Sequence, residues 1–292
     1  MPINIQESVN SVNIAESLDE DVINKIASDI AAGVELDLQS RSPWYKNNMD
    51  YLKMAMQIKE NKNFPWPGAA NVKYPLVTIA GLQFQARAYS GIVDTKGMVK
   101  GKGIGYDPAG TKALSAERVS KHMTYQLMDK IKNWDGDMDR LLLILPISGT
   151  AFKKVYYSSR YKKEVIDLVL PQDLVVNYWA SDLENARRIS HFYDLYHDEV
   201  QSRIKEGIYL DIDLQEPGYK PREYQEDQLR SLQAVSGDSK DNPHKICECH
   251  TKLDLDEDGI LEPYIVVLDW ETKRLLRIAP NFDLDSIRKN KK

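Results

Sequence analysis

The sequence predicts an α+β fold, in which a helical N-terminal half packs on a small antiparallel β domain and a further β-hairpin region lies near the C-terminus. Apolar residues recur at helical spacing through most of the chain up to Gly149. Beyond it they fall into short, β-rich runs separated by Pro171 or by charged turns. With 292 residues and 42% hydrophobic content, the chain can bury a core in one or two domains.

Two helices are expected in the first part of the chain. Ser17 followed by Glu20 forms a capping-box pattern, and apolar residues then recur at helical spacing until Gly33. Ser42 as the cap and Pro43 at the first helical position predict the start of a second helix.

A proline-rich stretch, FPWPGAANVKYPL at residues 64–76, follows these helices. Its three prolines fix the backbone in an extended form, and a disordered linker would not be expected to carry Phe64 and Trp66. We therefore expect a packed loop in which Trp66 is buried. A third helix continues from Pro75, and the moderate polarity of its stripe indicates contact with another subunit or a tightly packed neighbour; the stripe consists of Ile79, Gln83 and Ala86.

The segment GMVKGKGIGYDPAG, residues 97–110, sets glycines around Lys100 and Lys102. A P-loop requires G-x-x-x-x-G-K-[ST], and no Ser or Thr follows either lysine. A dinucleotide fingerprint would need a strong buried strand before Gly101, which the sequence lacks. We expect a glycine-rich surface hairpin, and a nucleotide-binding enzyme is the alternative that rests on residues 101–105 alone.

Helices and then strands are expected after Thr111. Two helices should be separated by NWDGD and should end at Pro146 and Gly149. The runs AFKKVYY, EVIDLVL, DLVVNYW and RISHFYDLY predict a compact antiparallel sheet or small barrel. HDEVQSRIKEG predicts a helix closed by Gly207. Residues 211–243 are polar with a possible helix at REYQEDQLRSLQAV, and KICECHTKL and PYIVVLDWETKRLLRI predict further strands.

The motif DLDEDGILEPYI places Asp254, Asp256 and Asp258 at positions one, three and five of an EF-hand-like loop, the spacing of oxygen ligands that Ca²⁺ prefers. Position twelve is Ile265 rather than a bidentate Glu, and Pro263 lies inside the loop. We therefore interpret the motif as an Asp-Gly hairpin turn with solvated carboxylates. The three aspartates are the metal candidates, and a calcium-dependent binding module is an alternative function.

Cysteine and histidine side chains were also considered as ligands or catalysts. His244, Cys247, Cys249 and His250 are ligand types of a zinc site, but on a strand the cysteines would face one side and His250 the other. Cys247 and Cys249 are too close in the sequence to form a disulfide that would stabilise the fold. A chain without such disulfides is typical of a reducing compartment. No Ser or Cys elbow accompanies the other histidines, so we expect no catalytic residue, no cofactor and no enzyme activity; they are His122, His191 and His197.

Charge and hydropathy exclude several classes of protein. The formal net charge of -5 and a pI near 5.7 argue against a protein that wraps nucleic acid, but not against one that DNA merely passes. The N-terminus MPINIQESVN has neither a basic nor an apolar signal region, and the sequence contains no apolar run of membrane-spanning length. We expect a soluble cytosolic protein without a membrane partner.

Four phrases of the sequence together resemble portal proteins of tailed bacteriophages, the head-to-tail connectors, and especially the large podovirus type. The resemblance covers most of residues 44–279, and the phrases occur in the family's order. They are FPWPGAANVKYPL, AERVSKHMTYQLMDKIKNWDGDMDRLLLILPISGTAFKKVYY, PQDLVVNYWASDLENARRISH and LDLDEDGILEPYIVVLDWETKRLLRI.

The resemblance implies a homo-oligomeric ring, twelve subunits in the family, at one vertex of the virion capsid and assembled in the host cytoplasm. Such a ring is a conduit through which double-stranded DNA is packaged and ejected without sequence-specific binding. Its implied partners are the major capsid or scaffold protein, the terminase and the tail adaptor proteins, and it has no catalytic site.

The resemblance also suggests a division of the chain into an N-terminal helical segment over 1–63, a wing-like α+β domain over 64–200, and a region of helix, polar loop and β-hairpin over 201–292. Large family members run to several hundred residues. We therefore expect this chain to supply mainly the outer wing and an incomplete part of the region that leads toward the stem and clip. The proline-rich stretch would then be a rigid elbow that seats Trp66 against the wing.

Overall fold

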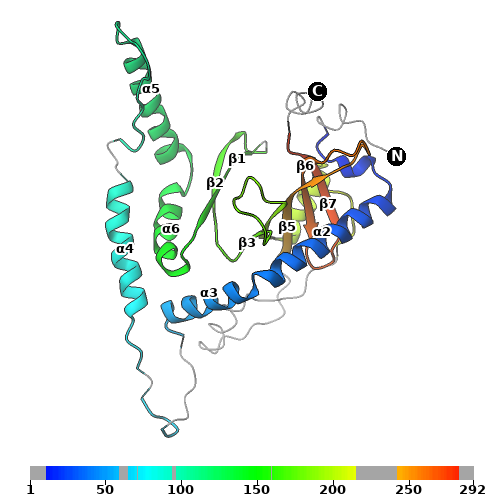
Figure 1. Cartoon of the computed structure of the whole chain (residues 1–292), viewed down its shortest axis with the longest axis horizontal. Helices are drawn as coiled ribbons and strands as arrows, with labels where there is room; N and C mark the ends of the chain where they lie inside the picture. Colours follow the sequence, from blue (N-terminus) through cyan, green and yellow to red (C-terminus); the bar gives the residue numbers. More distant parts are fainter. Residues whose placement is uncertain are drawn as a thin grey trace. The chain divides into compact units, whose positions relative to one another are not determined.

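The computed structural model of the protein describes residues 11–58, 65–70, 72–93, 97–158, 160–214 and 242–282. Within them it has six α-helices and two antiparallel sheets, which confirms the predicted α+β class (Figure 1). The chain forms two compact units: unit 1 comprises residues 1–46 and 172–292, and unit 2 comprises residues 47–171. This division differs from the boundaries expected after residues 63 and 200, because strands from both sides of residue 200 pair in one sheet.

Unit 1 is built on a five-stranded sheet. Its strands follow one another in chain order, each antiparallel to the next, so every connection joins neighbouring strands (Figure 1). The predicted runs DLVVNYW, RISHFYDLY and KICECHTKL each provide one strand, and PYIVVLDWETKRLLRI provides two. The strands are β3 (Leu174–Val176), β4 (Arg188–Leu195), β5 (His244–Leu253), β6 (Glu262–Asp269) and β7 (Leu275–Pro280).

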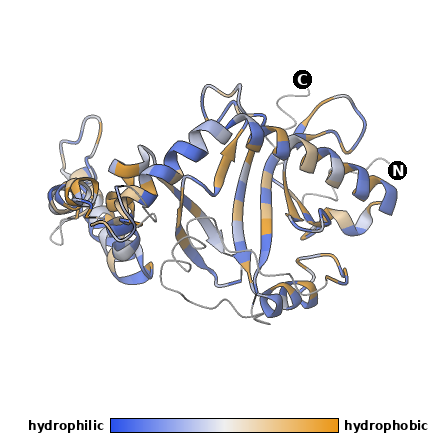
Figure 2. Ribbon diagram, turned by 90° about the horizontal axis from the view of Figure 1, so that it is seen from below, coloured by the Kyte–Doolittle hydropathy of each residue, from blue (hydrophilic) through white to orange (hydrophobic). Residues whose placement is uncertain are grey.

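Apolar side chains cover both faces of this sheet. On one face, Val266 and Cys249 pack with Ile30 and Val34 of α2 (Glu20–Ser40) in one buried cluster. On the other face, Ile246 and other residues of the sheet pack with α7 (His197–Lys205), which ends before Gly207 as predicted. The strands carry apolar segments (Figure 2), and residues 265–268 of β6 are apolar without interruption. The sheet thus lies between two helices.

The first long helix differs from its prediction at both ends. Ser17 does not cap it, because Ser17 closes a short 3-10 helix (η1, Ile14–Ser17) and donates a hydrogen bond to the carbonyl of Ile14. α2 also continues through Gly33 to Ser40. A Cβ at Gly33 would lie 2.7 Å from Cζ of Arg188, so this glycine permits a close approach within the helix instead of ending it.

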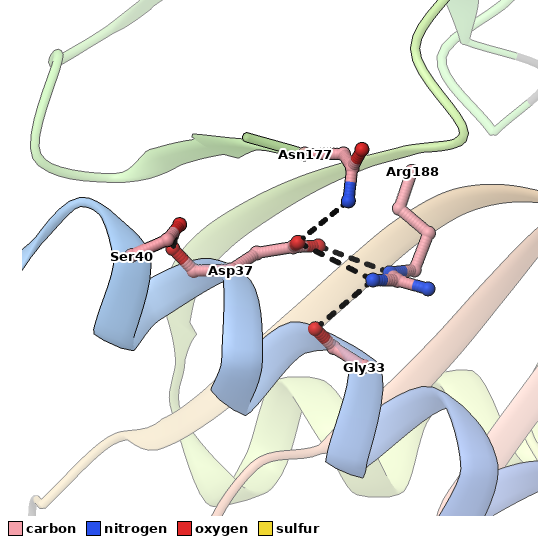
Figure 3. Close-up of polar contacts among 5 residues, drawn as sticks. All are labelled: Gly33, Asp37, Ser40, Asn177 and Arg188. Atoms are coloured by element: carbon pink, nitrogen blue, oxygen red, sulfur yellow. Dashed lines mark hydrogen bonds and ion pairs between the residues drawn. The ribbon is translucent and has the colours of Figure 1, made fainter. Parts of the chain in front are cut away.

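A buried charge pair joins α2 to the sheet (Figure 3). Arg188 Nε lies 3.0 Å from Oδ2 of Asp37, and Arg188 Nη2 donates to the carbonyl of Gly33 at 3.2 Å. Asn177 Nδ2 donates to Oδ1 of Asp37 at 2.8 Å. Asp37 is only 4% exposed, so these donors compensate for the removal of its charge from water.

Unit 2 consists of helices and one β-hairpin. Its boundary with unit 1 falls within α3, which begins at Ser42 as predicted. Gly81 of α4 faces Leu143 and Ile147 of α6, and Gln85 and Tyr89 donate hydrogen bonds from α4 to Asp139 and Asp135. The elements are α3 (Ser42–Ala55), α4 (Leu76–Ile92), α5 (Thr111–Tyr125), a π-helical turn η2 (Gln126–Lys130), α6 (Trp134–Ser148), β1 (Phe152–Ser158) and β2 (Lys163–Val169).

The break between α5 and α6 falls at Asn133, which has a positive φ of 63°. Pro146 does not end α6 as predicted but lies inside its last turn, and the helix ends at Gly149 with φ 77°. β1 and β2 form a separate two-stranded sheet, so the predicted four-stranded sheet or barrel is wrong: its other two strands belong to unit 1.

The proline-rich stretch is not packed as expected. Trp66 is 64% exposed and Tyr74 is 74% exposed, whereas the sequence predicted burial of Trp66. Pro75 does stand immediately before α4, as predicted. Phe64 and the possible helix at REYQEDQLRSLQAV, residues 222–235, lie outside the described residues.

Candidate functional surfaces

The three candidate metal ligands lie together in the turn between β5 and β6. One carboxylate oxygen from each of Asp254, Asp256 and Asp258 lies within 4.8 Å of the others. The backbone N–H of Gly259 donates to Asp254 at 2.9 Å, and that of Ile260 donates to Asp258 at 2.8 Å. The predicted Asp-Gly hairpin turn is confirmed, but Asp254 and Asp256 are half-buried rather than solvated, and whether the turn binds a cation stays a prediction.

A buried carboxylate that the sequence analysis did not consider lies at the foot of this turn. Glu262 pairs with Leu253 across the two strands and is only 2% exposed. Burial, together with the charges of Glu262, Asp256 and Asp254, raises the pKa of the Tyr264 hydroxyl far above its ordinary value. Carboxyl groups therefore extend from the turn into the interior of unit 1.

The zinc candidates are not brought to one place. Cys247 and Cys249 are both fully buried on the α2 side of the sheet, and burial raises the pKa of Cys249 to about 11. His250 lies on the other side of its strand, where its Nε2 is 2.9 Å from Glu248. The structure thus confirms the alternation expected of a strand, and the thiols have the character of core residues rather than of nucleophiles.

Two histidines that are distant in the sequence meet in unit 1. His197 Nδ1, at the start of α7, lies 3.0 Å from Nε2 of His244, so one nitrogen donates a hydrogen bond to the other. His244 Nδ1 lies 3.6 Å from Oδ1 of Asp269, and Thr272 donates to the other oxygen of Asp269 through its backbone and hydroxyl. The sequence analysis placed His197 apart from any partner, and only the pairing of β4 with β5 brings the two together.

The remaining histidines are not part of this cluster. His122 lies on α5 and is exposed, and the ring of His191 is 5.4 Å from that of Tyr193. His122 thus lies on a helix and His191 on a strand.

The glycine-rich segment owes its composition to close packing on α5. Val99 and Gly101 donate backbone hydrogen bonds to Thr124 and Ser120. A Cβ at Gly101 would lie 2.8 Å from the carbonyl oxygen of Ala116, so a larger residue would clash with the helix backbone. The segment contains no strand, so the predicted hairpin is wrong, and its glycines permit contact with a helix without any phosphate ligand.

Unit 2 leaves most of its large apolar side chains in contact with solvent. Among the described residues it holds 21 of the 30 exposed large hydrophobic side chains, but only four of the 28 buried hydrophobic ones. α5 contributes no buried residue. A hollow along α4 is lined by Ala80, Gln83, Phe84, Arg87 and Ala88.

Comparison with known proteins found no family model and no curated protein that matches the chain. In the described part of the chain, no helix combines the length and the apolar character needed to cross a bilayer.

Proposed function

We propose that the protein is a structural subunit of a tailed-bacteriophage portal ring, located at the capsid vertex of the virion and assembled in the host cytoplasm. The ring would conduct double-stranded DNA during packaging and ejection and would provide a docking platform for the terminase, the tail adaptor and the capsid or scaffold protein. The four portal-like phrases of the sequence support the proposal.

The observation that carries the proposal is the incomplete core of unit 2. A unit that fully buries only four apolar side chains and exposes 21 large ones leaves much apolar surface uncovered. Exposed apolar surface on this scale marks sites of protein interaction. In a closed ring, each copy would cover the exposed apolar surface of the next copy, and the same head-to-tail contact would repeat around the ring.

The test is the mass of the purified protein, measured by light scattering and by mass photometry. Twelve copies of the 33.5 kDa chain would weigh about 400 kDa, and ring-shaped particles should be visible in negative stain. Phe84→Asp should lower the mass, because Phe84 is 42% exposed beside the hollow on α4. Leu183→Asp is the control, since Leu183 is 47% exposed but lies in unit 1. A protein that remains monomeric at high concentration would overturn the proposal.

A calcium-dependent binding module is the second candidate, because the oxygens of Asp254, Asp256 and Asp258 lie within 4.8 Å of one another. A portal subunit needs no cation at this turn, so calcium-dependent melting discriminates between the candidates. Packing on α5 accounts for Gly101, so this glycine does not by itself favour the nucleotide-binding alternative.

A further inference from the structure

The net charge of the chain conceals two units of opposite sign. Residues 47–171 contain 19 Lys and Arg against 11 Asp and Glu, a formal net charge of +8. The remaining residues contain 20 Lys and Arg against 33 Asp and Glu, a formal net charge of -13. The acidity that argued against a nucleic-acid contact therefore belongs to unit 1 and does not describe unit 2.

Basic and aromatic side chains of unit 2 gather at the far end of the β1–β2 hairpin. Arg160, Lys162 and Lys163 follow one another around its turn together with Tyr161, which is 65% exposed. The guanidinium carbon of Arg160 lies 5.9 Å from the centre of the Tyr161 ring, and Nζ of Lys163 lies 5.7 Å from it. One ring thus holds two cations at the tip of the hairpin.

The hairpin emerges from unit 2 as a narrow ribbon. At its base, Val169 is 3% exposed and Nζ of Lys153 lies 4.8 Å over the Trp134 ring, so this end is held against α6. Further along, Val155, Tyr156 and Tyr157 are all exposed. Consecutive residues of a strand point to opposite faces, so the far half of the ribbon meets solvent on both faces.

We infer that this ribbon, residues 154–163 without Ser159, is a contact surface for the phosphate backbone of duplex DNA. A two-stranded β-ribbon fits the major groove of B-DNA. Lys and Arg neutralise phosphates, and Tyr hydroxyls such as those of Tyr157 and Tyr161 donate hydrogen bonds to them, whereas the hydroxyl of Tyr156 donates to Asp167 within the hairpin. An acidic protein surface as the partner would also be complementary to the positive charge of the ribbon. It would not explain why the ribbon is exposed on both faces and carries three tyrosines. The inference goes beyond the proposed ring function and does not depend on it.

The experiment measures binding of a fluorescent 30-base-pair duplex to the full chain over a series of salt concentrations. The test variant is Arg160→Gln/Lys162→Gln/Lys163→Gln. It should reduce the slope of log K against log[salt] by about 2.7, because each phosphate contact contributes about 0.9. The matched control is Arg187→Gln/Lys205→Gln/Lys252→Gln, which removes the same charge from exposed positions of unit 1 and should leave binding unchanged.

Several outcomes would overturn the inference: no binding of the duplex, equal effects of the two triple variants, tighter binding of a single strand of the same length, or equally tight binding of polyglutamate. Thermal unfolding checks that both triple variants are folded, which is expected because the substituted residues are not buried. Mass is measured in parallel. If the protein is a monomer that binds the duplex through the ribbon, the proposed ring is wrong and this inference holds. If the protein forms rings that do not bind the duplex, the proposed ring holds and this inference is wrong.

Discussion

Removal of the Arg188 side chain should destabilise unit 1 more than any surface substitution. In Arg188→Ala, Asp37 would remain in the interior without its cation. The Asp37 side chain is 5% exposed and that of Arg188 is 17% exposed, so solvent screens this pair only weakly. Breaking a buried pair by removing one partner costs about 3–5 kcal/mol. Because Asn177 still donates to Asp37, we expect the lower end, about 3 kcal/mol.

A loss of about 3 kcal/mol should lower the melting midpoint by about 6–12 °C in a unit of this size. Circular dichroism melts and urea titrations measure it, with Arg187→Ala as the control, because Arg187 is the adjacent residue and is exposed. The double variant Asp37→Leu/Arg188→Met should lose less than Arg188→Ala, because it leaves no buried charge. Equal midpoints for Arg188→Ala and Arg187→Ala would refute the reasoning, as would a double variant that is less stable than the single one.

Three other predictions concern exposed or titrating groups. Trp66→Ala should change the unfolding free energy by less than about 0.5 kcal/mol, because the side chain is 64% exposed; a loss of about 3 kcal/mol would mean that the loop is packed. Millimolar Ca²⁺ should not raise the melting midpoint relative to chelator, whereas a site filled at a hundred times its dissociation constant would add about 2.7 kcal/mol; a rise that Asp256→Asn abolishes would favour the calcium-binding candidate. Burial raises the pKa of Asp269, but contacts from His244 and hydrogen bonds from Thr272 outweigh it and hold the pKa below the ordinary 3.8. A carboxyl group with a lowered pKa stabilises the fold at pH values above 3.8, and this contribution is lost as the pH falls through the folded-state pKa. Asp269→Asn should therefore lose less stability than the unmodified protein below about pH 4. Identical curves of unfolding free energy against pH for the two proteins would contradict this prediction.

Local patterns predicted the types of element but not their partners. Alternation and β-rich composition located the strands, and helical spacing located the helices, because both depend on neighbours within a few residues. The sheet of unit 1 depends on pairing of β4 with β5, strands separated by residues 196–243. No local pattern encodes that distance, which is why the domain boundaries were placed differently.

The same limit explains the contacts that were missed. Gly33 has the signature of a helix end, and only the guanidinium of Arg188, 155 residues away, explains why it lies within a helix. His197 and His244 are 47 residues apart and meet through the strand pairing. The glycines near Lys100 form a pattern that fits both a phosphate-binding loop and a segment packed closely on a helix, because both need a backbone without a Cβ. In each case the residue type indicated a position with an unusual contact, but a local sequence pattern could not identify a partner that is distant in the sequence.

The formal net charge of the whole chain is a poor guide to the charge of either unit. A net charge of -5 describes neither unit, because +8 and -13 are carried by separate cores. Electrostatic attraction falls off within about 10 Å at 0.1 M salt, so a DNA backbone at the β1–β2 ribbon responds mainly to the charged side chains of that ribbon. An acidic chain can therefore offer a basic contact surface, and the two triple variants measure this by removing the same charge from each unit.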